Sequence, residues 1–217
     1  MSLINWSLWN QLKAKKYDKA GGHIGTATEY TDFAINGFMS MVGAVAYGDM
    51  FLPIATGKLP ASNFPAYTAY SAHLNAFTFA VGDYVDLVTQ ELPHCYKEGT
   101  DLEFHMHVIT NGTEAVEKAL KFEIYYVLGD MGGDMVAEAT LTPTTDLIIS
   151  ADTPDRHHLY YSLGTVGGAS LHIGNVLKLR VKRIASTGTA PASNPFVEMV
   201  GIHIMVDTLG SRQITIK

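Results

Sequence analysis

Beyond residue 85 the chain alternates apolar and polar residues over short segments. The clearest example is residues 102–108, in which every second residue is apolar, namely Leu102, Phe104, Met106 and Val108. Glu103, His105 and His107 occupy the positions between them. A period of two is typical of a half-buried strand, because successive side chains of a strand point to opposite faces. The pattern therefore predicts a strand with its apolar side toward a core and its polar side outward.

The same alternation recurs further along the chain, and turn-forming residues separate the segments. Strands are predicted within residues 120–126, 147–149, 159–163, 177–182 and 202–207, with a turn at 129–133 and a loop at 187–195. Residues 31–85 are apolar, aromatic and interrupted by Gly and Pro, which indicates short strands and long loops. Many short strands without a strong helix after residue 20 indicate an all-β protein, a β-sandwich of the jelly-roll type.

Residues 1–22 differ from the rest and are predicted to form an N-terminal arm or short helix, followed by a single sandwich domain at 23–217. Apolar residues repeat at helical spacing, lysines follow them, and a Gly-Gly pair ends the segment. Residues 1–19 carry a net charge of +3, so the remainder carries −9. Two interpretations stay open, a helix packed on its own domain or an arm that docks on a neighbouring subunit. The docking residues would be Ile4, Trp6, Leu8, Trp9 and Leu12.

Composition narrows the possible partners. Charged residues make up only 17% of the chain, so it is expected to bury much surface in its core or against other subunits. A net charge of −6 argues against a general nucleic-acid binder. The single Cys95 fits assembly in a reducing cytosol. Neither a secretory signal nor a membrane-spanning helix is predicted.

One segment has the spacing of metal ligands. Gly99, His105 and His107 resemble the opening of a metal-binding cupin signature, which would imply a metal-dependent enzyme. Glu114 follows His107 by seven positions, where the signature needs a spacing of three or four, and the second half of the signature is missing. The apolar side of the strand is also the side expected to face the core, so His105 and His107 would point away from it. A structural Zn²⁺ or Ni²⁺ shared between subunits is an alternative use of His94, His105 and His107.

Other chemistry finds little support in the sequence. There is no nucleophile elbow and no phosphate-binding loop, so no catalytic residue and no cofactor is predicted. Lys178, Arg180 and Lys182 form a basic stripe, for which a solvated or salt-bridged strand face is favoured over nucleic acid. The remaining histidines are expected to be exposed or to be hydrogen-bonded as part of the structure.

Two segments resemble uncharacterised virion proteins of tailed phages and prophages. The first is residues 90–107, which include Leu-Pro-His-Cys-Tyr-Lys-Glu-Gly-Thr-Asp and His-x-His, and the second is residues 204–213, which include Asp-Thr-Leu-Gly-Ser-Arg-Gln. Val108 stands where these proteins commonly have an aromatic residue. The resemblance implies an assembling jelly-roll domain with a structural role in the virion, and it implies no catalytic residue.

The expected function is therefore that of a non-enzymatic phage virion protein assembled in the host cytoplasm. It would be a capsid decoration or cement protein, a head fibre, or a component of the tail or neck. Its expected partners are itself, as a homo-oligomer and by analogy with viral jelly rolls a trimer, and virion proteins such as the major capsid protein. The alternatives are a cupin-like metal-dependent enzyme and a carbohydrate-binding module for host attachment.

Overall fold

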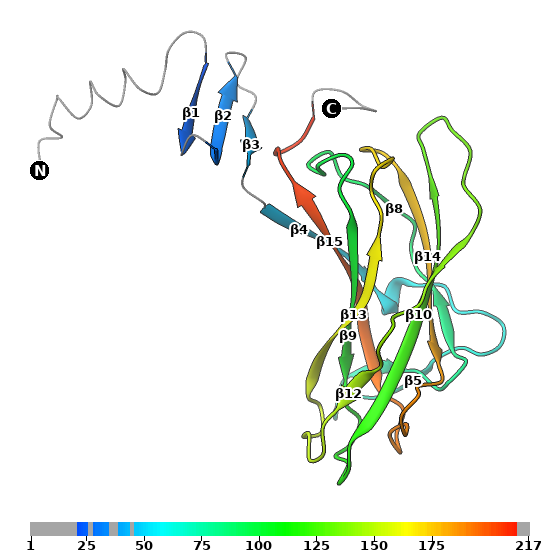
Figure 1. Ribbon diagram of the computed structural model, residues 1–217. Helices are drawn as coiled ribbons and strands as arrows, with labels where there is room; N and C mark the ends of the chain where they lie inside the picture. Colours follow the sequence, from blue (N-terminus) through cyan, green and yellow to red (C-terminus); the bar gives the residue numbers. More distant parts are fainter. Residues whose placement is uncertain (1–20, 26–27, 35–38, 44–45, 212–217) are drawn as a thin grey trace, which may run out of the picture.

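The alternating segments of the sequence form strands that stack as two antiparallel sheets (Figure 1). The computed structural model describes residues 21–25, 28–34, 39–43 and 46–211. Within these residues the regular structure consists of β-strands and one 3₁₀ turn, η1 (Ile54–Thr56). The predicted all-β sandwich is confirmed. The N-terminal docking residues, from Ile4 to Leu12, lie outside the described part of the chain.

The first sheet of the sandwich has the strand order β11-β10-β14-β7, with β12 also paired to β10 and β8 to β14. Its strands are β7 (Tyr84–Asp86), β8 (Gln90–Glu91), β10 (Lys118–Gly129), β11 (Ala139–Leu141), β12 (Leu147–Ile149) and β14 (Val176–Ile184). The longest pairing joins β10 to β14, with Lys121 opposite Ile184 and Gly129 opposite Val176.

The second sheet has the order β13-β9-β15-β6-β5, and β4 also pairs with β15. Its strands are β4 (Ala46–Pro53), β5 (Ala66–Ala69), β6 (Asn75–Thr78), β9 (Leu102–Ile109), β13 (His158–Val166) and β15 (Phe196–Val206). The last strand in the sequence, β15, lies in the middle of this sheet, between β9 on one side and β4 and β6 on the other.

A third, smaller sheet precedes the sandwich. Its strands β1 (Gly21–Gly25), β2 (Tyr30–Ala34) and β3 (Met39–Val42) are antiparallel and lie in the order β1-β2-β3. The small sheet stands off one end of the sandwich (Figure 1). A bridge between Ser40 of β3 and Thr208 joins it to the end of β15. The predicted division of the chain at residue 22 stays a prediction.

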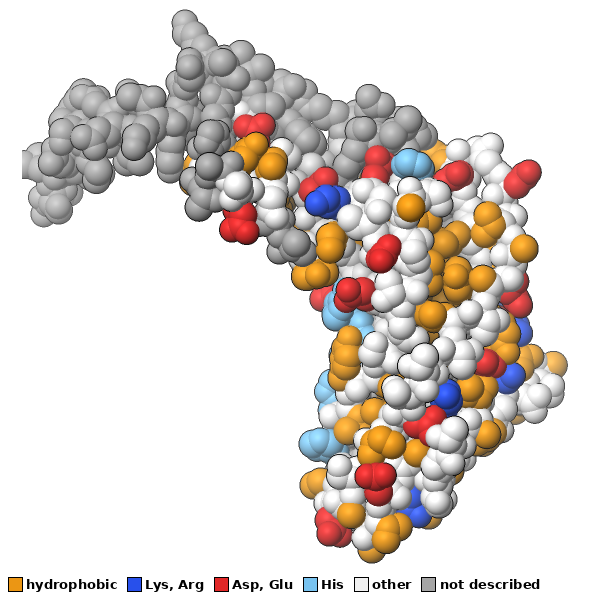
Figure 2. Space-filling view, viewed as in Figure 1, with side chains coloured by type: hydrophobic (Ala, Val, Ile, Leu, Met, Phe, Trp, Pro, Cys, Tyr) orange, Lys and Arg blue, Asp and Glu red, His pale blue; other side chains and the backbone are white. Residues whose placement is uncertain are grey.

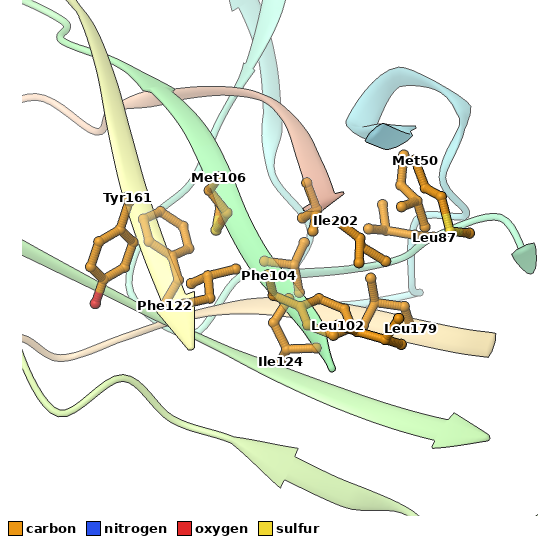
Figure 3. Close-up of a cluster of buried hydrophobic side chains, with 14 of the residues drawn as sticks. Met50, Leu87, Leu102, Phe104, Met106, Phe122, Ile124, Tyr161, Leu179 and Ile202 are labelled. Carbon is orange, nitrogen blue, oxygen red and sulfur yellow. The ribbon is translucent and has the colours of Figure 1, made fainter. Parts of the chain in front are cut away.

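The core fills the space between the two large sheets (Figure 3). The even-numbered residues of β9 point inward and are almost fully buried, as are facing residues of the other sheet. The side chains that meet there include Leu102, Phe104, Met106, Phe122, Ile124, Leu179 and Ile202. Burying one such side chain stabilises the fold by about 1.5–3 kcal/mol. The apolar residues of the alternating pattern therefore face the core of the sandwich, and the polar residues face outward.

Segments with weaker patterns also match expectation. The apolar region 31–85 contains the short strands β2 to β7 and connecting loops, and residues 187–195 form a loop between β14 and β15. Among the described residues, no helix has the length and apolar character needed to cross a membrane.

Candidate functional site

Four histidines gather on the outer surface of the second sheet. Strand alternation turns Phe104 and Met106 toward the core, so His105 and His107 point to the other side. Pairing with β13 places Tyr160 opposite His107, and pairing with β15 places His203 opposite Glu103. We call this surface of β4, β9, β13 and β15 the imidazole face. It carries His105, His107, His158, His203, Tyr160, Asp49 and Glu103.

The rings of the imidazole face are in contact. The centroid of the His105 ring lies 4.2 Å from that of His203 and 5.0 Å from that of Tyr160, with which it stacks at 25°. His107 stacks on His158 at 11°, with 4.9 Å between centroids. His107 Nδ1 and His158 Nε2 are 2.8 Å apart and share a hydrogen bond. Residues from three strands thus form one continuous ring cluster, and histidine side chains line one edge of the sandwich in Figure 2.

His105 lies on the outer face and is nevertheless buried. The sequence pattern predicts that the His105 side chain faces solvent, yet only 2% of the residue is exposed. Tyr160 and His203 cover it from two sides, and Gly201, opposite it on β15, leaves room for the ring. Its Nδ1 atom is buried without a hydrogen-bond partner. The polar side of β9 therefore points outward as predicted, but the neighbouring rings remove His105 from water.

Burial also controls protonation of this cluster. Desolvation, followed by repulsion from His203 and His107, lowers the pKa of His105 to about 4. Desolvation and the neighbouring His158 lower the pKa of His107 as well. Both effects favour the neutral imidazole, so His105 is uncharged at neutral pH. The His105 ring consequently contributes an uncharged aromatic surface at neutral pH.

The charges of the imidazole face are carboxylates. Asp49 Oδ1 lies 3.1 Å from His203 Nε2, and Glu103 Oε2 lies 3.9 Å from His203 Nδ1. The sequences of β4, β9, β13 and β15 contain no Lys and no Arg. Apart from histidine, this surface can therefore offer a partner only negative charge.

Large apolar side chains are exposed beside the histidines. On β4, Tyr47 and Phe51 alternate with the buried Met50 and Leu52, and they are 58% and 52% exposed. Tyr160 on β13 is 54% exposed. Exposed aromatic rings on one sheet face are typical of a surface that contacts another molecule. The arrangement is suited to binding another molecule.

The structure separates the histidines that the sequence suggested as metal ligands. His105 and His107 are neighbours, with ring centroids 5.2 Å apart. His94 Nδ1 instead contacts Ser211 Oγ at 2.6 Å. The carbonyl of Cys95, next to His94, accepts a hydrogen bond from the N–H of Asp207, which directly follows β15 and is six residues from the Gly201 that faces His105. Six extended residues span about 20 Å. His94 therefore lies far from His105.

The described residues do not form a metal-binding site. In the described ranges, no group of three or more His, Cys, Asp or Glu side chains has an arrangement that could hold a metal ion. A cupin site needs ligands that converge inside the barrel. His105 and His107 lie on the outside of the sheet, so they do not meet that requirement. A metal shared between subunits stays a prediction.

The segment that precedes the His-x-His pair closes one end of the sandwich. Leu92 and Tyr96 are completely buried. The Leu92 N–H donates to Asn175 O, and the Leu92 carbonyl accepts from Gly174 N–H. Tyr96 forms a bridge to Val206, just where β15 ends. The segment thereby ties the loop before β14 to the end of β15.

Two carboxylates of the same segment bind the backbone of the loop at 167–175. Glu98 Oε1 accepts the N–H of Ile173 at 3.0 Å, and Asp101 Oδ1 accepts that of Gly168 at 2.9 Å. A Cβ atom on Gly168 would lie 1.6 Å from the Thr100 carbonyl oxygen, so this close approach requires glycine. Glu98 and Asp101 therefore hold the loop at 167–175 in place.

The outer surface of the other sheet is charged and hollowed. A cavity of about 430 Å³ is lined by Lys58, Asp86, Leu87, Tyr125, Tyr126, Val127, Glu138, Lys178, Leu179 and Arg180. Arg180 donates to both carboxylate oxygens of Asp86, at 2.5 and 3.0 Å, and lies over the Tyr84 ring. Lys182 lies 3.3 Å from Glu123. Two residues of the basic stripe are thus salt-bridged.

The sequence alone identifies only part of the cluster. Nothing in it indicates that His158 and His203 lie near His105, from which they are 53 and 98 positions away. The alternation puts His105, His107 and His203 on the polar sides of their strands, whereas His158 precedes the predicted strand at 159–163. Only the strand pairing shows that these sides are the same face.

No protein-family model matches this sequence, and no curated protein matches it either. The fold is distantly similar to proteins of virus particles. For a structure of the infectious bursal disease virus Gx strain the TM-score is 0.36 at 11% identity, over 86% of this chain and 37% of that one. For the VP2 subviral particle of the same virus the TM-score is 0.36 at 10% identity, over 86% and 38%.

An insecticidal delta-endotoxin of Bacillus thuringiensis is similar to the same extent, with a TM-score of 0.36 at 11% identity, over 86% of this chain and 30% of the toxin. This chain thus spans less than two fifths of the length of each of these proteins. All of these likenesses are distant.

Proposed function

We propose that the chain is a non-enzymatic structural protein of a tailed-phage virion that assembles with copies of itself. Within the virion it would serve as a capsid decoration or cement protein, a head fibre, or a component of the tail or neck. The resemblance of residues 90–107 and 204–213 to phage virion proteins supports this class. Other virion proteins, such as the major capsid protein, would be its further partners.

The imidazole face is the single observation that carries the proposal. Tyr47, Phe51 and Tyr160 are each more than half exposed on one sheet surface whose strands contain no Lys or Arg. Subunit interfaces are rich in aromatic side chains and poor in charge at their centres. A sheet surface of this kind would be covered when the chain assembles.

The role of the phage-like motif supports the same conclusion. Glu98 and Asp101 accept backbone hydrogen bonds, and Leu92 and Tyr96 fill the end of the core. These are contributions to a rigid sandwich, which a virion component needs. The reducing cytosol in which phages assemble also suits a chain whose single cysteine, Cys95, is not in a disulfide.

Two measurements test the proposal. Light scattering at micromolar concentration should give the mass of a homo-oligomer, because the uncovered aromatic face favours self-association. Electron microscopy and mass spectrometry of purified particles should then find the chain in the virion. A monomer that is also absent from the particle would refute the proposal. Stoichiometric bound metal with a reaction lost in the His105→Ala/His107→Ala variant would favour the enzyme alternative.

A second candidate function is carbohydrate binding for host attachment. The cavity on the first sheet places Tyr125 and Tyr126 beside Asp86, Glu138 and Lys58. Aromatic rings for stacking and charged groups for hydrogen bonding are what a sugar-binding cleft requires. Binding to a glycan array that is lost in Tyr125→Ala, and retained in Tyr67→Ala on the other sheet, would support it. An array without binding would remove this candidate.

A further inference from the structure

The two outer faces of the sandwich differ in charge, because the outer face of the first sheet carries cations paired with carboxylates, Arg180 with Asp86 and Lys182 with Glu123. On the imidazole face the strands carry Asp49 and Glu103 and no Lys or Arg. On the opposite face, β14 alone contributes Lys178, Arg180 and Lys182. A basic partner segment would therefore be attracted to the imidazole face, whereas Asp86 and Glu123 of the other face already pair with Arg180 and Lys182 of β14.

The chain itself contains a segment of matching chemistry. Residues 1–20 have a net charge of +3, from four lysines and one aspartate. Their large apolar residues include Ile4, Trp6, Leu8, Trp9 and Leu12. This segment, which we call the arm, lies outside the described residues. The apolar residues of the arm could pack against the exposed rings of the imidazole face, and its lysines could pair with the carboxylates of that face.

The point at which the arm joins the structure favours a neighbouring copy over its own sandwich. Gly21 begins β1, the outer strand of the small sheet. The opposite strand, β3, is the one that bridges to the sandwich through Ser40 and Thr208. β1 thus lies on the side of the small sheet away from the sandwich (Figure 1). The attachment point of residues 1–20 is therefore separated from the sandwich by the width of the small sheet.

From these observations we infer that the imidazole face of one copy of the chain binds residues 1–20 of a second copy. The inference rests on the self-assembly in the proposed function and assigns the surface that carries it. Trp6 and Trp9 pack against Tyr47, Phe51 and Tyr160 of the neighbour. The lysines that follow lie near Asp49 and Glu103.

The dimensions agree with this assignment. A helix of 20 residues would be about 30 Å long, and an extended segment would be longer. The longest strand of the face, β15, has 11 residues and so runs about 36 Å. An extended arm is therefore long enough to cross the whole face, and a helical arm would cross most of it.

Zero-length carbodiimide cross-linking of the full-length chain tests the contact directly. Nitrogen-15-labelled and unlabelled protein are mixed, allowed to exchange and cross-linked, and the peptides are analysed by mass spectrometry. Links from Lys13, Lys15, Lys16 or Lys19 to Asp49 or Glu103 are expected. Peptide pairs that contain one labelled and one unlabelled partner prove that the link joins two copies.

A charge-reversal series gives an independent test. Asp49→Lys/Glu103→Lys should weaken self-association by about tenfold or more, as measured by sedimentation. The matched control is Glu117→Lys/Glu138→Lys, which makes the same charge change at exposed positions away from the imidazole face and should leave self-association unchanged. Melting temperatures of both variants verify folding. Mixing Asp49→Lys/Glu103→Lys with a chain whose four arm lysines are glutamates should restore association.

Several results would overturn the inference. Arm links that occur only within one copy would show that the arm covers its own sandwich. Links to Glu123, Asp86 or Glu138 would place it on the opposite face. An oligomer without arm links would refute this contact and leave the self-assembly of the proposed function intact. A monomer at all concentrations would contradict both.

Discussion

Gly201 and His105 lie directly opposite each other on β15 and β9, and the imidazole ring occupies the space above the glycine. A Cβ atom on Gly201 would be 2.3 Å from His105 Nε2 and 2.4 Å from Cε1, well inside contact distance. The absence of a side chain at 201 therefore allows His105 to lie flat against the sheet. The burial of His105 depends on this pairing.

Gly201→Ala is expected to destabilise the protein by about 1–3 kcal/mol, because the His105 ring must leave its packed position. Urea unfolding followed by circular dichroism measures the change. Tryptophan fluorescence is unsuitable, since both tryptophans lie in residues 1–20. Gly167→Ala is the control, with nothing within 4 Å of the new methyl group. In a His105→Ala background the penalty should shrink, and an equal penalty in both backgrounds would contradict the proposed contact.

Stability should fall as the pH drops from about 6.5 to about 4. The folded chain holds the pKa of His105 near 4, below its usual value of 6.5, so the unfolded chain binds a proton that the folded one does not. Stability from this group is complete above pH 6.5 and is lost by pH 4. The loss is on the order of 2 kcal/mol, reduced from the full shift because the face borders solvent. Unfolding across this range should be less pH-dependent in His105→Asn and unchanged in His73→Gln, an exposed position.

Glu98→Ala should destabilise the sandwich by about 1–3 kcal/mol, because it leaves the buried N–H of Ile173 without its acceptor. Glu98→Gln keeps a side-chain oxygen and should be milder. Lys97→Ala, at an exposed neighbouring position, serves as the control. Chemical unfolding of the three variants gives the comparison. If Glu98→Ala lowered the free energy of unfolding no more than Lys97→Ala, Glu98 would not be holding the loop at 167–175.

Arg183 is the cation on β14 that points inward, and only 2% of it is exposed. Its Nη1 donates to the carbonyl of Phe79 and, at 2.9 Å, to Asn194 Oδ1. Arg183→Ala should cost about 3–5 kcal/mol, because it leaves a cavity and the buried carbonyl of Phe79 without its donor. Lys178→Ala, on the exposed side of the same strand, should change stability by less than about 0.5 kcal/mol. Similar values for both in thermal unfolding would refute a structural role for Arg183.

The sandwich could be predicted from the sequence because its strands are long and alternate clearly. Residues 102–108 match β9 within one residue, and residues 177–182 fall inside β14. The separate sheet β1–β3 could not be predicted in this way. Its strands are short, and the apolar stretch that follows Thr31 has no period that would distinguish one sheet from another.

The site could be predicted only in part. The outward direction of His105 and His107 follows from alternation, but the burial of His105 depends on Tyr160, Gly201 and His203, which belong to other strands. Sequence spacing contains no information on which strands become neighbours. For the same reason the sequence suggests His94 as a partner of His105, whereas the structure places His94 beside Ser211.

The central position of β15 also governs when the protein can fold. β15 is the strand that joins β9 to β4, and it is made after all the other strands of the sandwich. During synthesis the edges of β4 and β9 that pair with β15 therefore stay unpaired until Phe196–Val206 has been made. Pairings so distant in sequence form slowly, and exposed strand edges aggregate. The imidazole face thus cannot form before β15 has been synthesised, which delays subunit association until then.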